Sequence, residues 1–223
     1  FAACSDDDNE GGQPGTPGAS GKQLVRWHES NDDYVDLHYG DDGWLARAYS
    51  SEGSDRDVIY IHENDGGKFT TITAYDADEM DDRPRCEFTF DNLLRRVDGE
   101  PCEYDAEGHM TSCGAYTFVW EDGNIIRVIN PDGYRYDFTY YTDLENKSPI
   151  DSDPLIYFIE DYFTIAHPQL LGTWSKNLVK TMTEHDEPTT TWKYTLDSDG
   201  YVTKAVEMQY DDSDDYYLEY EWK

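Results

Sequence analysis

The chain has 223 residues, of which 49 are Asp or Glu and 17 are Lys or Arg, so its formal net charge at pH 7 is −32. A charge of this sign and size repels nucleic acid phosphates and anionic lipid head groups, which excludes nucleic acid as a partner. Aromatic residues make up 15% of the chain and recur at alternate positions, a pattern that disordered acidic sequences lack.

The amino-terminal residues form a short motif, FAAC followed by SDDD. Phe1-Ala2-Ala3-Cys4 resembles the processing site of bacterial lipoproteins, in which small and apolar residues precede a cysteine that becomes acylated. The acidic run is similar to the export signal of surface lipoproteins of Bacteroidetes. This resemblance implies that Cys4 is the lipid attachment site. It also implies an outer-membrane lipoprotein that is exposed at the cell surface or, as the alternative, faces the periplasm.

Residues 9–22 contain many Gly and Pro residues and almost no apolar surface. Such a composition predicts a flexible tether with a span on the order of 20 Å. No second linker divides the remaining sequence, so we expect residues 1–22 to form the processing site and tether and residues 23–223 to form a single antiparallel β domain.

The first part of this domain contains short apolar runs separated by Asn, Asp, Gly or Ser clusters. These runs predict strands over 24–28, 34–39, 44–49, 58–62 and 69–75, followed by a polar loop over 76–85.

Between Phe88 and Tyr141 one unit recurs several times, in which an alternating aromatic run is followed by an acidic turn. Tyr134, Tyr136, Phe138 and Tyr140 share one face of a strand because successive side chains point to opposite sides. Tyr116, Phe118 and Trp120 repeat the spacing. A helix would scatter these rings around its axis, so the pattern favours strands.

The turns between these runs carry hairpin signals. Asp122-Gly123 predicts a two-residue type I′ turn that pairs Trp120 with Ile125. Two longer turns, 105–108 and 197–200, place Gly three residues after Asp, which predicts a type I turn closed by a left-handed glycine. In the first of them Tyr104 would oppose Met110. Further hairpin signals are Asp41-Asp42-Gly43 and Asp65-Gly66-Gly67. Consecutive hairpins predict a meander.

The pattern changes after residue 150. Asp153 followed by Pro154 is a helix-start signal, and apolar residues follow at i, i+3 and i+4 spacing as far as Phe163. We expect one amphipathic helix that covers an open end or edge of the sheet. Strands resume afterwards, including 193–196, 201–208 and 216–222.

Three stretches near the carboxyl terminus carry a family resemblance: LGTWSKNL at 171–178, YTLDSDGYV at 194–202 and the terminal YEWK. Together they resemble a family of Bacteroidetes lipoproteins of unknown function with a porin-like fold, and the turn units are loosely similar to the tyrosine-aspartate repeats of large bacterial surface proteins. The resemblance implies a barrel-like antiparallel sheet without an assigned activity.

The predicted fold class is therefore all-β with one or two short helices, an antiparallel meander of consecutive hairpins, curved or closed into a soluble barrel-like sheet. The predicted strands of five to eight residues are shorter than the ~9 to 11 residues that cross a bilayer.

Besides Cys4, the sequence contains an odd number of cysteines: Cys86, Cys102 and Cys113. A two-residue loop would place Cys102 opposite Cys113 and permit a disulfide, whereas the three-residue loop that we prefer places it opposite Ser112. The alternatives are a 102 to 113 disulfide and buried free thiols, of which we favour the thiols.

The sequence contains no recognisable catalytic or metal-binding motif. A calcium loop begun at Asp197 would place Tyr201 and Met208 at ligand positions, which excludes it. The six His residues have no metal spacing, and we expect them to be surface groups. Nucleotide-binding glycine loops and a nucleophile elbow are also missing. We predict no metal, no cofactor and no catalytic residue.

The function that fits these observations is a monomeric, non-catalytic cell-surface lipoprotein that binds an extracellular ligand, either a glycan or a protein. The alternative is a hydrolase that acts on glycans through paired carboxylates. An exposed row of rings would favour binding, and a deep pocket with two carboxylates would favour hydrolysis.

Overall fold

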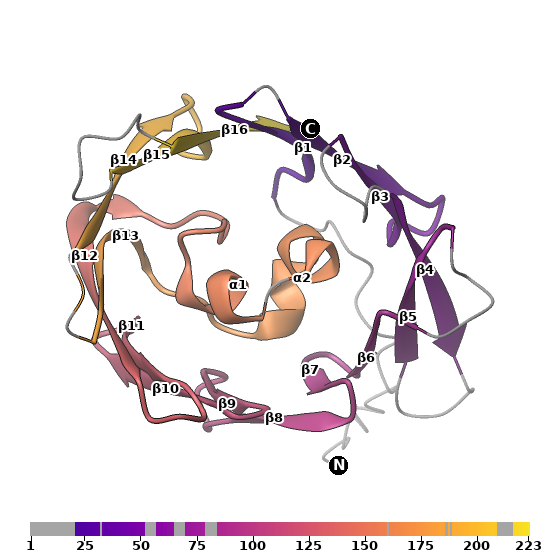
Figure 1. Cartoon of the computed structure of the whole chain (residues 1–223), viewed down its shortest axis with the longest axis horizontal. Helices are drawn as coiled ribbons and strands as arrows, with labels where there is room; N and C mark the ends of the chain where they lie inside the picture. The colour runs from indigo at the N-terminus through magenta and orange to yellow at the C-terminus, as the bar shows by residue number, and fades with distance from the viewer. Residues whose placement is uncertain are drawn as a thin grey trace, which may run out of the picture.

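The structure is a computed structural model, and it describes residues 21–31, 33–51, 57–64, 70–78, 84–159, 161–185, 187, 189–208 and 216–223. These residues form a closed antiparallel barrel in which the strands follow chain order around the ring and β1 pairs with β16 (Figure 1). The predicted all-β meander is confirmed, and it is closed.

The strands of the barrel are β1 (Leu24–Glu29), β2 (Tyr34–Tyr39), β3 (Leu45–Ser50), β4 (Asp57–Asn64), β5 (Thr70–Asp76), β6 (Cys86–Phe90), β7 (Leu94–Val97), β8 (Glu100–Tyr104), β9 (Met110–Cys113), β10 (Tyr116–Glu121), β11 (Asn124–Ile129), β12 (Arg135–Glu145), β13 (Asn177–Glu184), β14 (Thr190–Leu196), β15 (Val202–Met208) and β16 (Tyr216–Trp222). Between β12 and β13 lie α1 (Pro154–Phe158), α2 (Tyr162–Ala166) and the 3-10 helix η1 (Pro168–Leu171). We call residues 146–176 the plug. No helix among the described residues is long and apolar enough to span a membrane.

The hairpin turns have the predicted chemistry. Asp122 and Gly123 both have positive φ, 50° and 78°, and Trp120 pairs with Ile125, as a type I′ turn requires. Gly108 and Gly200 donate their N–H groups to the carbonyls of Asp105 and Asp197 at 3.3 and 3.1 Å. Tyr104 pairs with Met110 as expected. The turn signal at Asp65-Gly66-Gly67 lies outside the described residues.

A recurring hydrogen bond explains why the aromatic residues repeat with the hairpins. From an even-numbered strand, a Tyr hydroxyl or Trp indole N–H donates to a carbonyl in the first three residues of the preceding strand. The instances are Tyr39 to Leu24, Tyr104 to Leu94, Trp120 to Met110, Tyr140 to Ile125, Tyr194 to Val179 and Trp222 to Val202, at 2.6–2.9 Å. Each bond satisfies a buried polar tip while the ring fills the interior.

The two faces of the barrel differ sharply. Inward positions carry buried apolar side chains such as Ile72, Phe88 and Phe118. Outward positions carry ion pairs between neighbouring strands, among them Arg26–Asp36, Arg47–Asp57, Arg127–Asp137 and Lys204–Glu219. The apolar wall therefore faces the lumen and the charged wall faces outward.

The plug fills this lumen. A ring of sixteen strands encloses more space than its own side chains can fill. Figure 1 shows α1 and α2 inside the ring. Phe163 of α2 packs against Phe88 and Tyr60 with ring centroids 5.1 and 6.0 Å apart, and Phe158 of α1 packs against Tyr136 at 4.7 Å. The plug thus supplies the core that the strands cannot form alone.

The predicted fold class, with one or two short helices, is confirmed, whereas the prediction that a single amphipathic helix covers an end or edge of the sheet is corrected. Asp153 caps α1 as predicted, accepting a hydrogen bond from the Leu155 N–H, but a second cap at Asp161 starts α2, so the segment forms two short helices. Both lie inside the barrel because a closed ring leaves no open sheet edge to cover.

We call the end of the barrel where the plug leaves β12 and returns to β13 the entry end, and the opposite end the mouth. At the entry end, the plug bonds to hairpin tips. Thr173 N–H donates to the Gly108 carbonyl at 3.0 Å, and Lys176 N–H donates to the Gly123 carbonyl at 2.9 Å.

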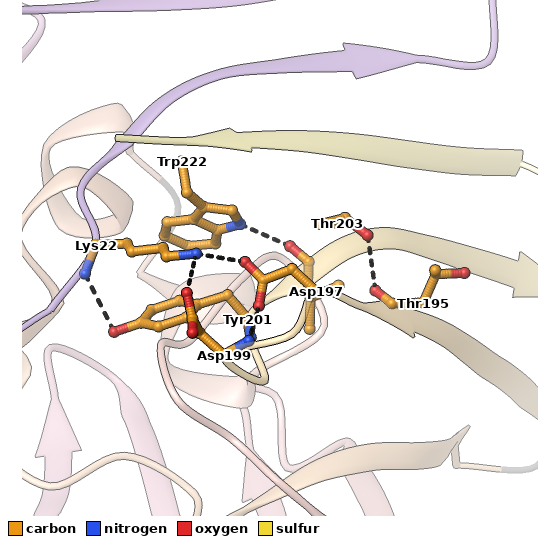
Figure 2. A network of polar contacts seen from close by, with 8 residues as sticks. Lys22, Thr195, Asp197, Asp199, Tyr201, Thr203 and Trp222 are labelled. Carbon is orange, nitrogen blue, oxygen red and sulfur yellow. Dashed lines mark hydrogen bonds and ion pairs between the residues drawn. The ribbon is translucent and has the colours of Figure 1, made fainter.

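The seam between the first and last strands closes at the same end. Gln23 and Lys223 exchange both backbone hydrogen bonds at 2.9 Å. Lys22 Nζ lies 2.7 Å from a carboxylate oxygen of Asp197 and of Asp199, and its backbone N–H donates to the Tyr201 hydroxyl (Figure 2). The chain therefore reaches the barrel at the entry end, over the β14–β15 turn.

Three local expectations are corrected. Cys102 pairs with Cys113, not with Ser112, because a register shift between Glu103 and Tyr104 compensates for the three-residue loop, and a disulfide joins the two. Tyr134 precedes β12 and is 48% exposed, since the turn that closes on Asn130 ends there. β12 has 11 residues, more than the predicted five to eight, and its last residue, Glu145, still pairs with Asn177 at the start of β13.

His167 contradicts the expectation of surface imidazoles. It is fully buried, and its Nε2 accepts a hydrogen bond from the Leu45 N–H at 2.9 Å. Burial lowers the pKa of His167 to about 3, so the ring is neutral. It is a core residue of the plug.

Candidate functional site

A cavity of about 790 Å³ lies in the mouth of the barrel, between the wall and the plug. Its walls come from strand ends at the mouth, for example Glu29 on β1, Tyr136 on β12 and Tyr216 on β16, and its floor comes from α1 and the start of α2. The volume falls in the range of small-molecule sites.

Aromatic rings form much of the cavity wall. They include Trp27, Tyr136, Tyr157, Tyr162, Trp192 and Tyr216. Trp27 and Tyr162 hold each other in place, with ring centroids 5.7 Å apart, and Trp192 is buried. Tyr157, on the plug, is 42% exposed. The cavity therefore offers both fixed rings and one accessible ring.

Three carboxylates gather on the side of the cavity formed by β15, β16 and β1. The Tyr216 hydroxyl donates to Glu29, and Asp151 and Glu207 also lie close enough to act on it. Burial first, and then these charges, raise the pKa of Tyr216. Tyr220 donates its hydroxyl hydrogen to Asp151 Oδ2 at 2.9 Å. Carboxyl groups therefore cluster on this side of the cavity.

The opposite side contains Asp161 and Arg85. Asp161 caps α2 by accepting from the Phe163 N–H at 2.7 Å, and it also accepts from the Tyr60 hydroxyl at 2.8 Å. Burial raises the pKa of Asp161, while its hydrogen bonds and the positive charge of Arg85 act against that rise. Arg85 also lies 3.4 Å from Asp76. Asp161 is thus a structural carboxylate that holds the plug to β4.

A second cavity of about 460 Å³ adjoins the first. The two share Arg85, Tyr116, Phe158 and Asp161, and the second continues between the plug and β6 past Cys86, Phe88 and Val97. Burial raises the pKa of the Cys86 thiol far above its ordinary value, so this cysteine is not a thiolate nucleophile at neutral pH.

The residues singled out from the sequence lie elsewhere. Cys4, the predicted lipid attachment site, is outside the described residues. Cys102 and Cys113 form a hairpin disulfide. The cavity residues were not predicted, and the signal that could have found two of them is an acidic residue at an inward position, Glu29 after Trp27 and Glu207 after Ala205.

Asp105, Glu107 and His109 form a group that has the composition of a metal site. Their geometry follows from the β8–β9 turn, because Asp105 Oδ1 accepts from the N–H groups of Glu107 and His109 at 2.9 Å. The His109 ring stacks on Trp120 with centroids 4.4 Å apart. We therefore interpret this group as turn structure.

No protein-family model and no curated protein matches the sequence. Two solved structures are similar in fold. A porin-like protein from Bacteroides uniformis ATCC 8492 is 15% identical and superposes with a TM-score of 0.54, covering 90% of this chain and 98% of that chain. A porin-like protein from Bacteroides vulgatus ATCC 8482 is 11% identical, with a TM-score of 0.49 and coverage of 90% and 99%. The first likeness confirms the porin-like fold and, at this identity, nothing beyond the fold.

Proposed function

We propose that this chain is a non-catalytic, lipid-anchored surface protein that binds a glycan in the mouth of its barrel. The observation that carries the proposal is the mouth cavity, about 790 Å³ in volume and walled by aromatic rings and carboxylates.

Sugars match this lining. The apolar face of a pyranose packs on an aromatic ring, and its hydroxyls donate to carboxylates. Rings already fixed by packing, such as Trp27 against Tyr162 at 5.7 Å, lose little entropy when a ligand binds. The adjoining second cavity favours a ligand of several sugar units over a single one.

A transport pore through a membrane fits the structure less well. The outward face carries cross-strand ion pairs, for example Arg127–Asp137 at 2.6 Å, and a charge at the lipid face of a barrel costs about 2–4 kcal/mol near the bilayer centre. The plug also packs into the lumen through Phe163 and Phe158. Both observations support a barrel that stands in water.

The position of the amino-terminal segment supports a tethered binding protein. The described chain begins beside Tyr201 at the entry end, whereas Glu29 at the other end of β1 lines the mouth. A lipid on Cys4 would therefore be joined to the barrel at the end opposite the mouth. This arrangement suits capture of a ligand from outside the cell.

A glycan array with the full chain tests the proposal, followed by calorimetry on the hits. Tyr157→Ala removes the accessible ring of the plug and should weaken binding about tenfold or more, since stacking rings dominate such sites. Tyr217→Ala is the matched control because Tyr217 lies on the outer wall, with Lys204 Nζ 3.5 Å from its ring centre. Silence across the array, or equal binding by both variants, would contradict the proposal and leave a protein ligand as the better hypothesis.

A second candidate function is hydrolysis of a glycan. The observation that favours it is the gathering of Glu29, Asp151 and Glu207 around Tyr216 in one cavity, since glycosidases use paired carboxylates. Prolonged incubation with each bound glycan, followed by mass spectrometry, separates the two. Binding alone leaves the glycan intact, whereas hydrolysis releases fragments and is lost in Glu207→Gln.

A further inference from the structure

The second cavity, of about 460 Å³, is lined largely by apolar side chains. Among them, Phe88 and Ile159 are buried, and Val97 and Phe158 are half-buried and pack against the same core. None of these four side chains carries a hydrogen-bonding group. A ligand group that lies against them therefore binds best when it is apolar.

The carboxylates of this cavity are exposed to solvent or already hydrogen-bonded. Asp98 and Glu100, at the β7–β8 turn, are exposed, and Asp98 also accepts a hydrogen bond from a β6 N–H at 2.8 Å. Asp161 accepts from the Phe163 N–H and the Tyr60 hydroxyl. A sugar unit that turned its hydroxyls toward the apolar lining would lose hydrogen bonds to water without replacement, which costs free energy.

The junction of the two cavities contains hydrogen-bond donors. Arg85 and Tyr116 line both cavities. The Arg85 guanidinium has several N–H groups, so it can donate to a ligand carbonyl while it also contacts Asp76 at 3.4 Å. The Tyr116 hydroxyl can donate as well. A ligand that extends from the mouth cavity into the second cavity would thus meet aromatic rings, then donors, then apolar side chains.

An acyl group on a sugar has its parts in the same order. Its ester or amide carbonyl lies next to the sugar ring and accepts hydrogen bonds, and its alkyl chain lies beyond the carbonyl. An alkyl ether lacks the carbonyl. A free fatty acid fits less well, because its carboxylate would be repelled by the carboxylates of Asp98 and Glu100.

We propose that the second cavity is a subsite for an acyl group, so that the ligand of the barrel mouth is an acylated glycan. This inference rests on the proposed function, because it adds a subsite to the glycan site in the mouth cavity. Each methylene of the acyl chain that is buried should tighten binding about fourfold.

An array that carries each glycan in two forms, with free hydroxyls and as butyryl esters, tests this inference on the full chain. We expect the butyryl form of the bound glycan to give the stronger signal. Calorimetry then compares the acetyl and butyryl esters of that glycan. The butyryl ester should bind about tenfold more tightly, because its longer chain buries more methylenes. Sodium butyrate, which has the acyl chain without the sugar, should displace neither ester.

A pair of alanine variants assigns the effect to the second cavity. Ala115, on the β9–β10 turn, is exposed and lines this cavity, so Ala115→Trp should fill part of it. The preference for the butyryl ester over the acetyl ester should be lost in this variant. Ala106 is exposed on the β8–β9 turn at the entry end, so Ala106→Trp adds the same ring elsewhere and should keep the preference. Thermal melting checks that both variants are folded.

Failure of this inference differs from failure of the proposed function. Equal binding of the butyryl and free forms, the same preference in both alanine variants, or displacement of the esters by butyrate would overturn the acyl subsite while glycan binding stands. Silence of both forms across the array would contradict the proposed function itself.

Discussion

At the scale of single residues, the buried carboxyl of Asp153 links the stability of the plug to pH. Asp153 is 2% exposed and accepts hydrogen bonds from the Leu155 N–H and the Asn146 amide, both at 3.0 Å. Burial raises the pKa of Asp153 from 3.8 to about 7 despite these bonds. The folded protein therefore holds a proton on Asp153 that the unfolded chain has lost.

The sign of the effect follows from this difference. Stability from the protonated Asp153 is fully present below pH 3.8 and is lost as the pH rises through about 7. We expect the melting temperature to fall between pH 6 and pH 8.5, by several degrees. Asp153→Asn cannot ionise, so the part of the fall in melting temperature that comes from Asp153 should be missing in this variant. This holds whatever the variant's absolute stability. An identical slope in both proteins, measured by thermal circular dichroism, would contradict the prediction.

His167 produces the opposite dependence. Its pKa is lowered from 6.5 to about 3, so its stabilising contribution is present above pH 6.5 and is lost as the pH falls toward 3. His167→Phe keeps a ring beside Trp44 and Phe163, whose centroids lie 4.8 and 4.9 Å from the imidazole, but it leaves the Leu45 N–H without its acceptor.

We expect His167→Phe to be less stable than the native chain by about 1–3 kcal/mol at pH 7, and this difference to shrink at pH 4.5. Urea unfolding at the two pH values measures it. A difference that stays constant or grows on acidification would show that the imidazole is not the neutral core group that its burial indicates.

At the scale of elements, the contact between the plug and the β8–β9 turn depends on a glycine. Gly172 has φ of 82°, and a Cβ there would lie 2.5 Å from the Gly108 carbonyl oxygen. Gly133 has nearly the same φ, 81°, with nothing within 4 Å of a built Cβ. The two positions therefore differ in close approach and not in backbone conformation.

Gly133→Ala should lower the free energy of unfolding by about 1 kcal/mol, because alanine is strained at a positive φ. Gly172→Ala should lower the free energy of unfolding by at least about 2 kcal/mol more than this, because the plug must also move away from the β8–β9 turn. Denaturant unfolding of the two variants gives the difference. Equal losses of stability in the two variants would contradict the prediction, because they would mean that the plug moves away from the turn at no cost in free energy.

The same elements show which features could be predicted from the sequence. Turn chemistry is local, so the Trp120–Ile125 and Tyr104–Met110 pairings across the 122–123 and 105–108 turns were predicted correctly, and alternation of rings along β12 and β16 predicted the inward face. The Cys102–Cys113 pairing failed because a bulge in the neighbouring strand offset the loop length.

The position of the plug and the residues of the cavity could not be predicted in this way. Asp153 marked a helix start, but only the width of the closed ring decides that the helix lies inside, and ring closure depends on β1 and β16 meeting across nearly the whole chain. The cavity combines Glu29, Tyr136 and Glu207 from strands far apart in sequence. Their proximity is a product of topology, so no spacing in the sequence could reveal it.

At the scale of the whole molecule, the distribution of polarity predicts behaviour in solution. Charges pair across strands on the outer wall, as in Lys204–Glu219 at 2.8 Å, and rings fill the inside. We expect the unlipidated chain to stay monomeric without detergent, since a net charge of −32 opposes association. Analytical ultracentrifugation checks this, and a requirement for detergent would contradict the polarity that we assign to the outer wall.

The closed ring also predicts that the barrel tolerates circular permutation. Gln23 and Lys223 exchange two hydrogen bonds at 2.9 Å, so a short linker could join them once residues 1–22 are removed. New ends between Asp132 and Gly133 would fall in an exposed turn at the mouth, where breaks are tolerated. We expect this permuted chain to unfold cooperatively with the near-ultraviolet circular dichroism of the parent.

Opening the chain between Leu171 and Gly172 instead would separate the plug from β13. Leu171 is fully buried and Gly172 lies against the Gly108 carbonyl, so the ends would fall where the plug is held to the wall. Because the wall depends on the plug to fill its lumen, this second permuted chain should lose cooperative unfolding and bind hydrophobic dyes. If both permuted chains behaved alike, the strands would close without the plug, and the lumen would not depend on it.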